Sequence, residues 1–281
     1  MEITGAIEEV RRQVKEWRKQ GLSVGLVPTM GYLHEGHKSL IVKAAAENDK
    51  VVVSDFVNPI QFGVNEDLDA YPRDIEADKK VCEEAGADLI FHPEVTEMYA
   101  PDFSTYVEMS KVSEGLCGKT RPTHFRGVCT VVSKLFHIVM PDRAYFGQKD
   151  AQQLAVIRQM VRDLNMDIQI VACPIVREAD GLAKSSRNTY LNEAERRAAL
   201  VLSKAVFHGE DLMKKGERDA ETILTAMREI IEKEPMAKID YVEMVDADTI
   251  EPLAKAEGRV LTAMAVYIGK TRLIDNFIAE L

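Results

Sequence analysis

Near its beginning the chain places an apolar run, a glycine-containing turn and the start of a helical pattern directly one after another. The apolar run is Leu22–Val27, the turn is Pro28–His37, and the helical pattern is Lys38–Glu47, whose apolar residues share one face. This order predicts a buried strand, a tight turn and a helix. A buried strand that leads straight into a helix is the building unit of parallel α/β sheets, so this segment constrains the fold more than any other.

Two histidines stand where the predicted helix begins. His34 and His37 are three residues apart, and Gly36 lies between them. Backbone N–H groups and the positive end of a helix dipole favour an anion at such a turn, and we expect a nucleotide phosphate there. The alternative is that these histidines are solvated or cap the helix. A zinc site is disfavoured, because the metalloprotease pattern needs histidines four residues apart on a formed helix.

Apolar runs and helical patterns go on alternating through more than half of the chain. The predicted strands are Val51–Val57, Asp88–Phe91, Ala144–Phe146 and Ile168–Ala172, and the predicted helices are Asp74–Ala85, Phe125–Val139 and Gln152–Leu164, after an opening helix that ends near Gly21. Strands that alternate with helices predict an α/β fold with a mostly parallel sheet.

The pattern changes beyond Asn192. Two helical stretches are followed there by three strand-like runs: Glu193–Lys215, Ala220–Glu232, Ile239–Val245, Val260–Ile268 and Arg272–Ile278. Helices followed by consecutive strands predict a second, smaller α+β domain.

Four polar segments each come directly after a predicted strand. They are Pro28–His37, Asn58–Gly63, Gly147–Gln153 and Arg177–Asn188. In an open parallel α/β sheet the carboxyl ends of the strands form the ligand crevice. We therefore expect the four segments to converge on one site.

Composition excludes several classes of function. A net charge of -10 argues against a nucleic-acid-binding surface, which would carry a basic stripe. No stretch approaches the ~18 continuous apolar residues of a membrane span, and the first residues lack the features of a signal peptide, so we expect a cytoplasmic protein. The cysteines have no paired spacing, which predicts small buried hydrophobic residues: Cys82, Cys117, Cys129 and Cys173.

Charged and hydroxyl side chains in two of the segments suit a phosphate. Lys149 and Arg187 supply positive charge, and Ser185 and Ser186 supply further donors. Elsewhere in the four segments, the neutral amides of Asn58, Gln61 and Gln153 suit a small hydroxylated acid.

No covalent nucleophile is indicated. The Gly-x-Ser-x-Gly and Walker patterns are absent from the sequence. We therefore expect chemistry that holds two substrates together and stabilises negative charge, without an enzyme-bound covalent intermediate.

Six blocks of residues occur in an order that is typical of one family. They are Val27–Gly31 with His34–His37, Phe56–Gly63, Tyr71–Arg73, Arg121–Val128, Phe146–Asp150 with Gln152–Gln153, and Asp180–Ala183 with Ser185–Asn188. On these blocks the chain resembles the pantothenate synthetase (pantoate–β-alanine ligase) family, a branch of the nucleotidyltransferase superfamily that shares the HIGH-type phosphate motif with class I aminoacyl-tRNA synthetases.

The resemblance implies a fold and a reaction. It implies a Rossmann-like doubly wound parallel sheet in residues 1–176, binding nucleotide and pantoate, and a smaller α+β domain in residues 177–281 that carries a KMSKS-like loop. The carboxylate of (R)-pantoate would attack the α-phosphorus of ATP with Mg²⁺, releasing pyrophosphate. The amine of β-alanine would then attack the pantoyl adenylate, giving pantothenate and AMP. A homodimer is also implied.

The resemblance further implies roles for individual residues. The implied catalytic residues are His34, His37, Lys149, Ser185, Ser186 and Arg187. The implied ATP-binding residues are these six together with Pro28, Thr29, Met30, Gly147, Asp150, Val176 and Lys184. The implied pantoate-binding residues are Pro28, Met30, Asn58, Gln61 and Gln153, and no metal-ligating side chain is implied.

One departure and three alternatives remain. Members of the family often carry methionine before Ser-Ser-Arg-Asn, whereas this chain has Lys184, which brings the loop nearer to the KMSKS form. A nucleotidyltransferase proper is the nearest alternative enzyme, but amides rather than a second basic cluster accompany the histidines. Length and net charge disfavour a tRNA synthetase. A non-catalytic ATP sensor is the alternative from another class.

Overall fold

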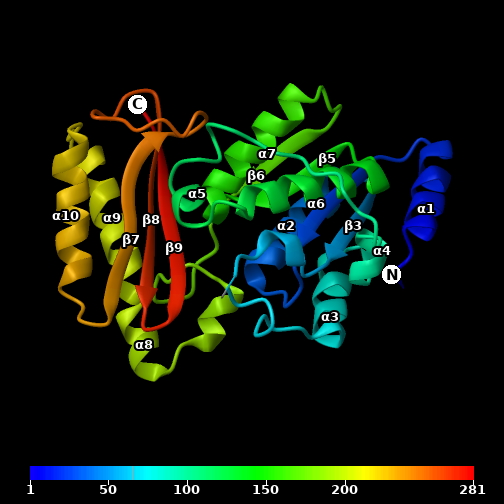
Figure 1. Ribbon diagram of the computed structural model, residues 1–281, viewed down its shortest axis with the longest axis horizontal. Helices are drawn as coiled ribbons and strands as arrows, with labels where there is room; N and C mark the ends of the chain where they lie inside the picture. Colours follow the sequence, from blue (N-terminus) through cyan, green and yellow to red (C-terminus); the bar gives the residue numbers. More distant parts are fainter. Residues whose placement is uncertain (65) are drawn as a thin grey trace. The chain divides into compact units, whose positions relative to one another are not determined.

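Six parallel strands form the sheet that the alternating pattern predicts, in the order β1-β4-β3-β2-β5-β6 (Figure 1). Their bounds are β1 (Glu2–Thr4), β2 (Val24–Thr29), β3 (Lys50–Asp55), β4 (Leu89–Phe91), β5 (Arg143–Gly147) and β6 (Gln169–Cys173). The computed structural model describes residues 1–64 and 66–281. The predicted α/β class is confirmed.

Helices cover both faces of this sheet. They are α1 (Ile7–Lys19), α2 (Glu35–Glu47), α3 (Ile75–Ala85), α6 (His124–Val139) and α7 (Ala151–Asp163). From β2 the chain adds β3 and β4 on one side and β5 and β6 on the other, while β1 lies at the edge beside β4. Right-handed crossovers therefore place α2 and α3 on one face and α1 and α6 on the other. This is the doubly wound arrangement, with the chain reversing direction at β2.

Alternation along the buried strands divides the core between the two faces. Val27, Val51 and Val53 pack with Leu40 and Ile41 of α2 in one apolar cluster. Each of these five side chains is at most 7% exposed, so the sheet face under α2 is closed to water. Burial on this scale is the main force that fixes α2, and hence its first turn, against the sheet.

The chain divides into two compact units. The first comprises Met1–Met109, Arg121–Gln148 and Val156–Pro174, and the second comprises Ser110–Thr120, Lys149–Ala155 and Ile175–Leu281. The division of the domains at residue 176 stays a prediction.

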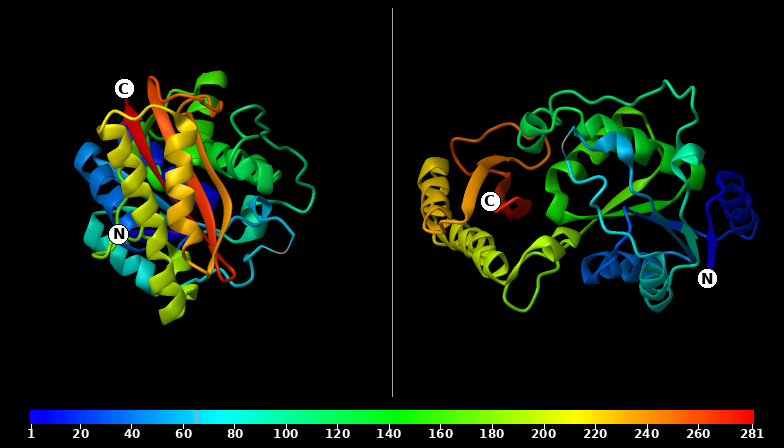
Figure 2. Two further views of the ribbon diagram at one scale, coloured as in Figure 1. Left: turned by 90° about the vertical axis from the view of Figure 1, so that its left-hand side faces the viewer. Right: turned by 60° about the horizontal axis from the view of Figure 1, so that its bottom comes forward.

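An antiparallel sheet of three strands forms the centre of the second unit, in the order β7-β8-β9. The strands are β7 (Ala237–Asp246), β8 (Arg259–Ile268) and β9 (Thr271–Glu280). Helices α9 (Leu200–Lys214) and α10 (Ala220–Glu232) lie over one face of this sheet, as the left view of Figure 2 shows. Leu202, Ile223, Met227 and Met264 are the buried centre of that contact.

Short helices make up the remaining regular structure. They are α4 (Val95–Met98), α5 (Cys117–Thr120), α8 (Glu193–Ala198) and the 3₁₀ turns η1 (Pro59–Gln61), η2 (Gln148–Asp150) and η3 (Ser186–Tyr190).

Several details differ from the sequence predictions, and one is that α2 begins at Glu35 rather than at Lys38. The strand β1 was not predicted, because three residues on a sheet edge carry too little pattern. The single helix predicted over Glu193–Lys215 is two helices, since the turn tightens at Ala199, whose carbonyl accepts from the Leu202 N–H. Cys117 is only half-buried, whereas the other three cysteines are buried as predicted.

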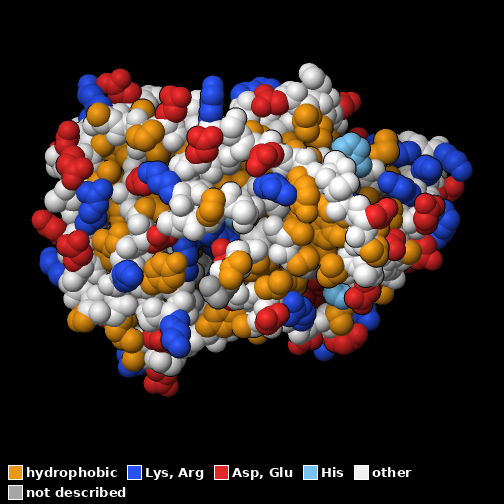
Figure 3. Space-filling view, viewed as in Figure 1, with side chains coloured by type: hydrophobic (Ala, Val, Ile, Leu, Met, Phe, Trp, Pro, Cys, Tyr) orange, Lys and Arg blue, Asp and Glu red, His pale blue; other side chains and the backbone are white. Residues whose placement is uncertain are grey.

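The surface carries both signs of charge. Acidic and basic side chains are interspersed over the face shown in Figure 3, in keeping with a net charge of -10. In the described part of the chain, no helix combines the length and the apolar character that crossing a membrane requires.

Candidate functional site

The two histidines lie at the first turn of α2, where they complete a capping box. His34 is the N-cap residue, and its Nδ1 accepts from the Gly36 N–H at 3.1 Å. His37 is the third helical residue, and its Nδ1 accepts from the His34 N–H at 3.3 Å. The rings stack with their centroids 4.1 Å apart. The capping role considered above is therefore real.

The two capping bonds are made through the Nδ1 atoms of the rings. An imidazole that accepts through Nδ1 is neutral and carries its proton on Nε2. Both rings thus present an N–H donor through Nε2, at the positive end of the α2 dipole. An anion such as a phosphate is the ligand that this arrangement suits.

The end of β2 leads directly into this turn. Pro28 and Thr29 are its last two residues and pair with Ser54 and Asp55 of β3. The Thr29 hydroxyl donates to the Ser54 carbonyl at 2.7 Å and accepts from the Gly31 N–H at 3.1 Å. The segments after β2 and β3 therefore leave the sheet side by side, as expected for neighbouring parallel strands.

Amide side chains after β3 form a connected chain of hydrogen bonds. Gln61 donates through Nε2 to the Met30 sulfur at 3.1 Å and accepts through Oε1 from Asn58 at 2.9 Å. The Tyr99 hydroxyl donates to Asn58 Oδ1 at 2.7 Å. Asn58 is 1% exposed and Gln61 is 8% exposed, so the orientation of both amides is fixed.

A close helix approach fixes the backbone of the same segment. A Cβ on Gly127 of α6 would overlap the Ile60 carbonyl and the backbone of Gln61. Glycine lets α6 touch η1, and the Gly127 carbonyl accepts from Asn58 at 3.2 Å. The blocks Phe56–Gly63 and Arg121–Val128 thus belong to one structural feature.

A buried pair of carboxyl groups lies behind the histidine turn. Asp78 of α3 is 2% exposed and Asp55 of β3 is 5% exposed. Burial and the neighbouring Asp55 raise the pKa of Asp78 to about 6, although bonds from Leu33 and Tyr32 oppose the rise. His92 lies beside Asp55, which raises the pKa of the imidazole.

This pair makes stability depend on pH. The folded-state pKa of Asp78 lies above its ordinary value of 3.8. The folded protein therefore loses stability as pH rises from about 4, and the loss is complete above about 6. The cost corresponds to roughly 3 kcal/mol. We expect Asp55→Asn to relieve part of it, so the gain in the free energy of unfolding is larger at pH 8 than at pH 4. Urea denaturation at the two pH values measures this, and an equal or smaller gain at pH 8 contradicts the interpretation.

The cationic half of the predicted site lies in the second unit. Gly147 ends β5 and Lys149 follows two residues later in η2, beside Asp150. The Lys149 ammonium donates to the Lys184 carbonyl at 3.0 Å. Burial lowers the pKa of Lys149, and the nearby Arg187 lowers it further. The two cations are thus close together, and an arriving anion would favour the charged form of the lysine.

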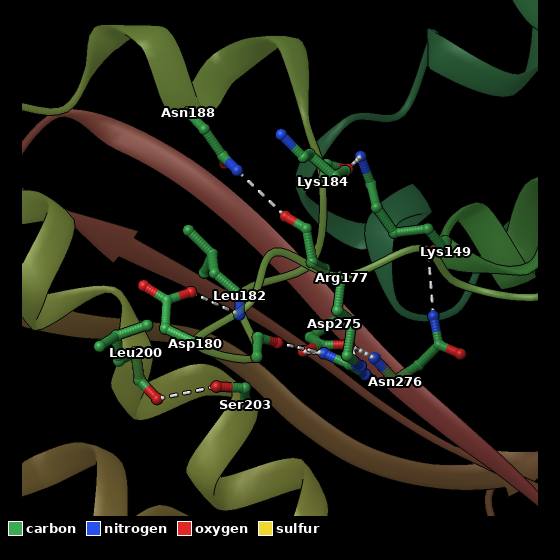
Figure 4. Close-up of polar contacts among 12 residues, drawn as sticks. Lys149, Arg177, Asp180, Leu182, Lys184, Asn188, Leu200, Ser203, Asp275 and Asn276 are labelled. Carbon is green, nitrogen blue, oxygen red and sulfur yellow. Dashed lines mark hydrogen bonds and ion pairs between the residues drawn. The ribbon is translucent and has the colours of Figure 1, made fainter. Parts of the chain in front are cut away.

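Strand β9 fastens this lysine and the loop beside it (Figure 4). Asn276 donates to the Lys149 carbonyl at 2.8 Å. Asp275 pairs with both terminal nitrogens of Arg177, at 2.7 and 2.9 Å, and Arg177 also donates to the Gly181 carbonyl at 3.0 Å. Asp275 is 1% exposed and Arg177 is half-buried, so the ion pair is partly shielded from water.

The loop from Val176 to Asn188 is closely tied to the rest of its unit. Lys184 N–H donates to the Val176 carbonyl, and Asn188 donates to Glu178 and to the Ala183 carbonyl. Arg196 binds Glu178 and Asp180, and it thereby anchors the loop to α8.

The serines of the loop have different surroundings. Ser185 caps η3, accepting from the Arg187 N–H at 3.3 Å, whereas Ser186 is 7% exposed. Gln153 is half-buried on α7, in the second unit, and its pairing with Gln61 stays a prediction.

Sequence reasoning gave no role to the residues that hold the site residues in place. Asp78, Asp275 and Asn276 make polar contacts with the predicted segments, and Arg177, which begins one of these segments, pairs with Asp275. Among the described residues, no group of three or more His, Cys, Asp and Glu side chains could hold a metal ion.

Comparison with known proteins assigns the chain to a family. The family model described as pantoate-beta-alanine ligase matches residues 2–278. The chain is 64% identical to the pantothenate synthetase of Ruminiclostridium cellulolyticum over 277 residues, covering 99% of this chain and 98% of that protein.

Solved structures agree. The pantothenate synthetase of Thermus thermophilus superposes with a TM-score of 0.94 at 43% identity, covering 99% of both chains. The pantoate-beta-alanine ligase of Francisella tularensis, in a complex with beta-gamma ATP and beta-alanine, gives a TM-score of 0.82 at 34% identity, covering 99% of this chain and 97% of that one. With its doubly wound sheet and the matching sequence from end to end, this chain belongs to the pantoate–β-alanine ligase family.

Proposed function

We propose that this chain condenses (R)-pantoate with β-alanine in two steps that consume ATP and pass through an enzyme-bound pantoyl adenylate. Family membership supports the ligation. The observation that carries the mechanism is the pair of capped, neutral imidazoles at the start of α2, each with a donor on Nε2. Such donors stabilise charge that develops on a phosphate and need no covalent intermediate.

In the first step the carboxylate of pantoate attacks the α-phosphorus of ATP. His34 and His37 donate to phosphate oxygens, and Lys149 and Arg187 stabilise the growing negative charge. Pyrophosphate leaves and pantoyl adenylate remains bound. Further contacts with ATP come from Pro28, Thr29, Met30, Gly147, Asp150, Val176, Lys184, Ser185 and Ser186.

Pantoate is held by neutral groups. Gln61 and Asn58 offer oriented amide donors and acceptors to its hydroxyl groups and carboxylate, with Pro28, Met30 and Gln153 beside them. In the second step the amine of β-alanine attacks the acyl carbon, and pantothenate and AMP leave. The crystal structure of the Francisella tularensis relative in complex with beta-gamma ATP and beta-alanine supports ATP and β-alanine as ligands.

Magnesium enters with its nucleotide as Mg-ATP. The triphosphate carries more charge than two neutral imidazoles and two cationic side chains can neutralise, so ligation should require Mg²⁺.

We also propose that the protein is a homodimer in the cytoplasm, and sedimentation at micromolar concentration tests the dimer.

Product analysis tests the proposed function. The protein is mixed with Mg-ATP and pantoate, with and without β-alanine. The products are then separated, identified and quantified by mass spectrometry. With β-alanine we expect AMP, pyrophosphate and the amide in equal amounts. A nucleotidylated acceptor indicates a transferase, and unchanged ATP with all three substrates present indicates a sensor. Either result contradicts the proposal.

Replacing Gln61 separates the two substrate sites. We expect Gln61→Ala to weaken pantoate binding about 5- to 100-fold, because a polar group of the ligand loses its partner at roughly 1–3 kcal/mol. ATP affinity should change less than about threefold, since the Gln61 side chain bonds to Asn58 and to the Met30 sulfur, whereas the proposed phosphate contacts come from His34, His37, Lys149 and Arg187. Calorimetry with each substrate measures both. Equal losses would show that Gln61 lies outside the pantoate pocket.

A further inference from the structure

A carboxylate of α3 holds the turn that carries the histidines. Asp78 accepts from the Tyr32 N–H at 2.7 Å through Oδ2 and from the Leu33 N–H at 2.6 Å through Oδ1. Successive backbone N–H groups that converge on one anion form a concave anion-binding nest. Here the anion is a side chain of the same protein, 2% exposed, and the next residue along the chain is His34.

The turn adopts a conformation that needs such a partner. Gly31 has a φ of 76° and Tyr32 has a φ of 52°, so two consecutive residues occupy the left-handed region. A tyrosine rarely adopts this conformation, and it persists only where the surroundings fix it. The two bonds to Asp78 are short and charge-assisted, and they join the turn to a helix that packs against α2.

We propose that Asp78 is a positioning residue of the ligase reaction: its carboxylate fixes the Tyr32–Leu33 backbone and thereby sets the direction in which His34 presents its ring. This inference rests on the proposed function, because His34 is the group through which it acts. Asp78 itself touches the backbone and not the reacting atoms.

Asp55 provides a built-in comparison. It is as deeply buried as Asp78 and lies beside Gly31, where a Cβ would overlap its Oδ1. The described contacts of its side chain are with His92 and Asp78, not with the N–H groups of the turn. Two neighbouring buried carboxyl groups thus differ in whether they hold the histidine turn.

Matched isosteric variants test the proposal. We measure single-turnover pyrophosphate release at pH 8 with saturating Mg-ATP and pantoate. Asp78→Asn should be about 30- to 100-fold slower, because an amide offers one acceptor where two N–H groups need one each. The KM for pantoate should stay within about threefold, and Asp55→Asn should keep its rate within about threefold. Similar losses in both variants would overturn the proposal.

A double-mutant cycle shows whether Asp78 acts through His34. In a His34→Asn background the substitution Asp78→Asn should cost less than about threefold, since the ring that it positions is already gone. A loss as large as in the wild-type background would mean that Asp78 supports the fold in general, and it would overturn the proposal.

A measurement on the wild-type protein covers the case in which Asp78→Asn does not fold, and it is independent of activity. The titratable groups near Asp78 and the turn are Asp55, Cys82 and His92, with Glu94 beside His92, and His34 and His37 at the start of α2. By NMR, the amide protons of Tyr32 and Leu33 should shift together with pH as Asp78 titrates. Asp55→Asn should move that transition to lower pH, because it removes the neighbouring charge. Amide shifts that stay flat, or that do not move in Asp55→Asn, would overturn the proposal even if the ligase activity is confirmed.

Discussion

Replacing either histidine by alanine should slow pyrophosphate release about 100- to 1,000-fold in a single turnover, the usual effect of losing one preorganised charge stabiliser. Both rings accept through Nδ1 in the capping box of α2, so both carry their N–H donor on Nε2 at the positive end of the helix. Rapid-quench measurement with labelled ATP gives the rate. Normal release in both alanine variants would remove the histidines from the chemistry.

The capping role calls for a control that keeps the helix intact. Asparagine is a preferred N-cap residue, so His34→Asn should retain the bond to the Gly36 N–H. Its free energy of unfolding should lie within about 0.5 kcal/mol of the wild-type value. His34→Ala should lose about 1 kcal/mol. We expect both variants to be equally slow, since neither has the distant Nε2 donor. A fast His34→Asn would mean that only helix capping matters.

Lys149→Met should be the second most damaging change, with adenylate formation slowed about 100-fold or more. Methionine keeps the bulk of the side chain and removes the ammonium. That ammonium donates to the Lys184 carbonyl and is the second cation beside Arg187. The rate of the first step should fall while pantoate affinity stays the same, because the amide side chains of Asn58 and Gln61 are unchanged. Single-turnover pyrophosphate release and pantoate affinity, measured together, show this pattern.

A lysine elsewhere in the same unit gives the matched control. Lys119 forms an ion pair with Glu243, and more than half of its side chain is exposed. Lys119→Met removes the same charge from the protein and should leave the rate within about twofold, as surface ion pairs contribute little. If both methionine variants lose activity alike, net charge rather than the buried ammonium explains the effect.

Much of the fold could be predicted from local pattern. The helix over Ala220–Glu232 was predicted with the bounds that the structure has, because its apolar stripe is strong. The helix predicted from Asp74 begins at Ile75, and the structure adds that the Asp74 side chain caps it. The edge strand β1 could not be predicted, since three residues show no periodicity.

In the candidate site too, residues in local motifs could be predicted from the sequence, whereas residues that act through long-range contacts could not. Residues that stand in dense motifs, such as His34 and His37, were identifiable because glycine and a strand end marked their position. Asp78 was not, because it is one acid in a charged helix and contacts a turn 45 residues earlier in the chain. Arg177 and Asp275 are 98 residues apart, and nothing in either segment indicates the partner. Long-range contacts of this kind depend on the tertiary fold.

Following the oxygen atoms of pantoate tests the central claim most directly. Pantoate labelled with ¹⁸O in its carboxylate is turned over with Mg-ATP and β-alanine, and the products are analysed by mass spectrometry. If the carboxylate attacks the α-phosphorus, one labelled oxygen stays on phosphorus when the amide forms. The account predicts one ¹⁸O in AMP and none in pyrophosphate. Unlabelled AMP, or label in inorganic phosphate with formation of ADP, would contradict it.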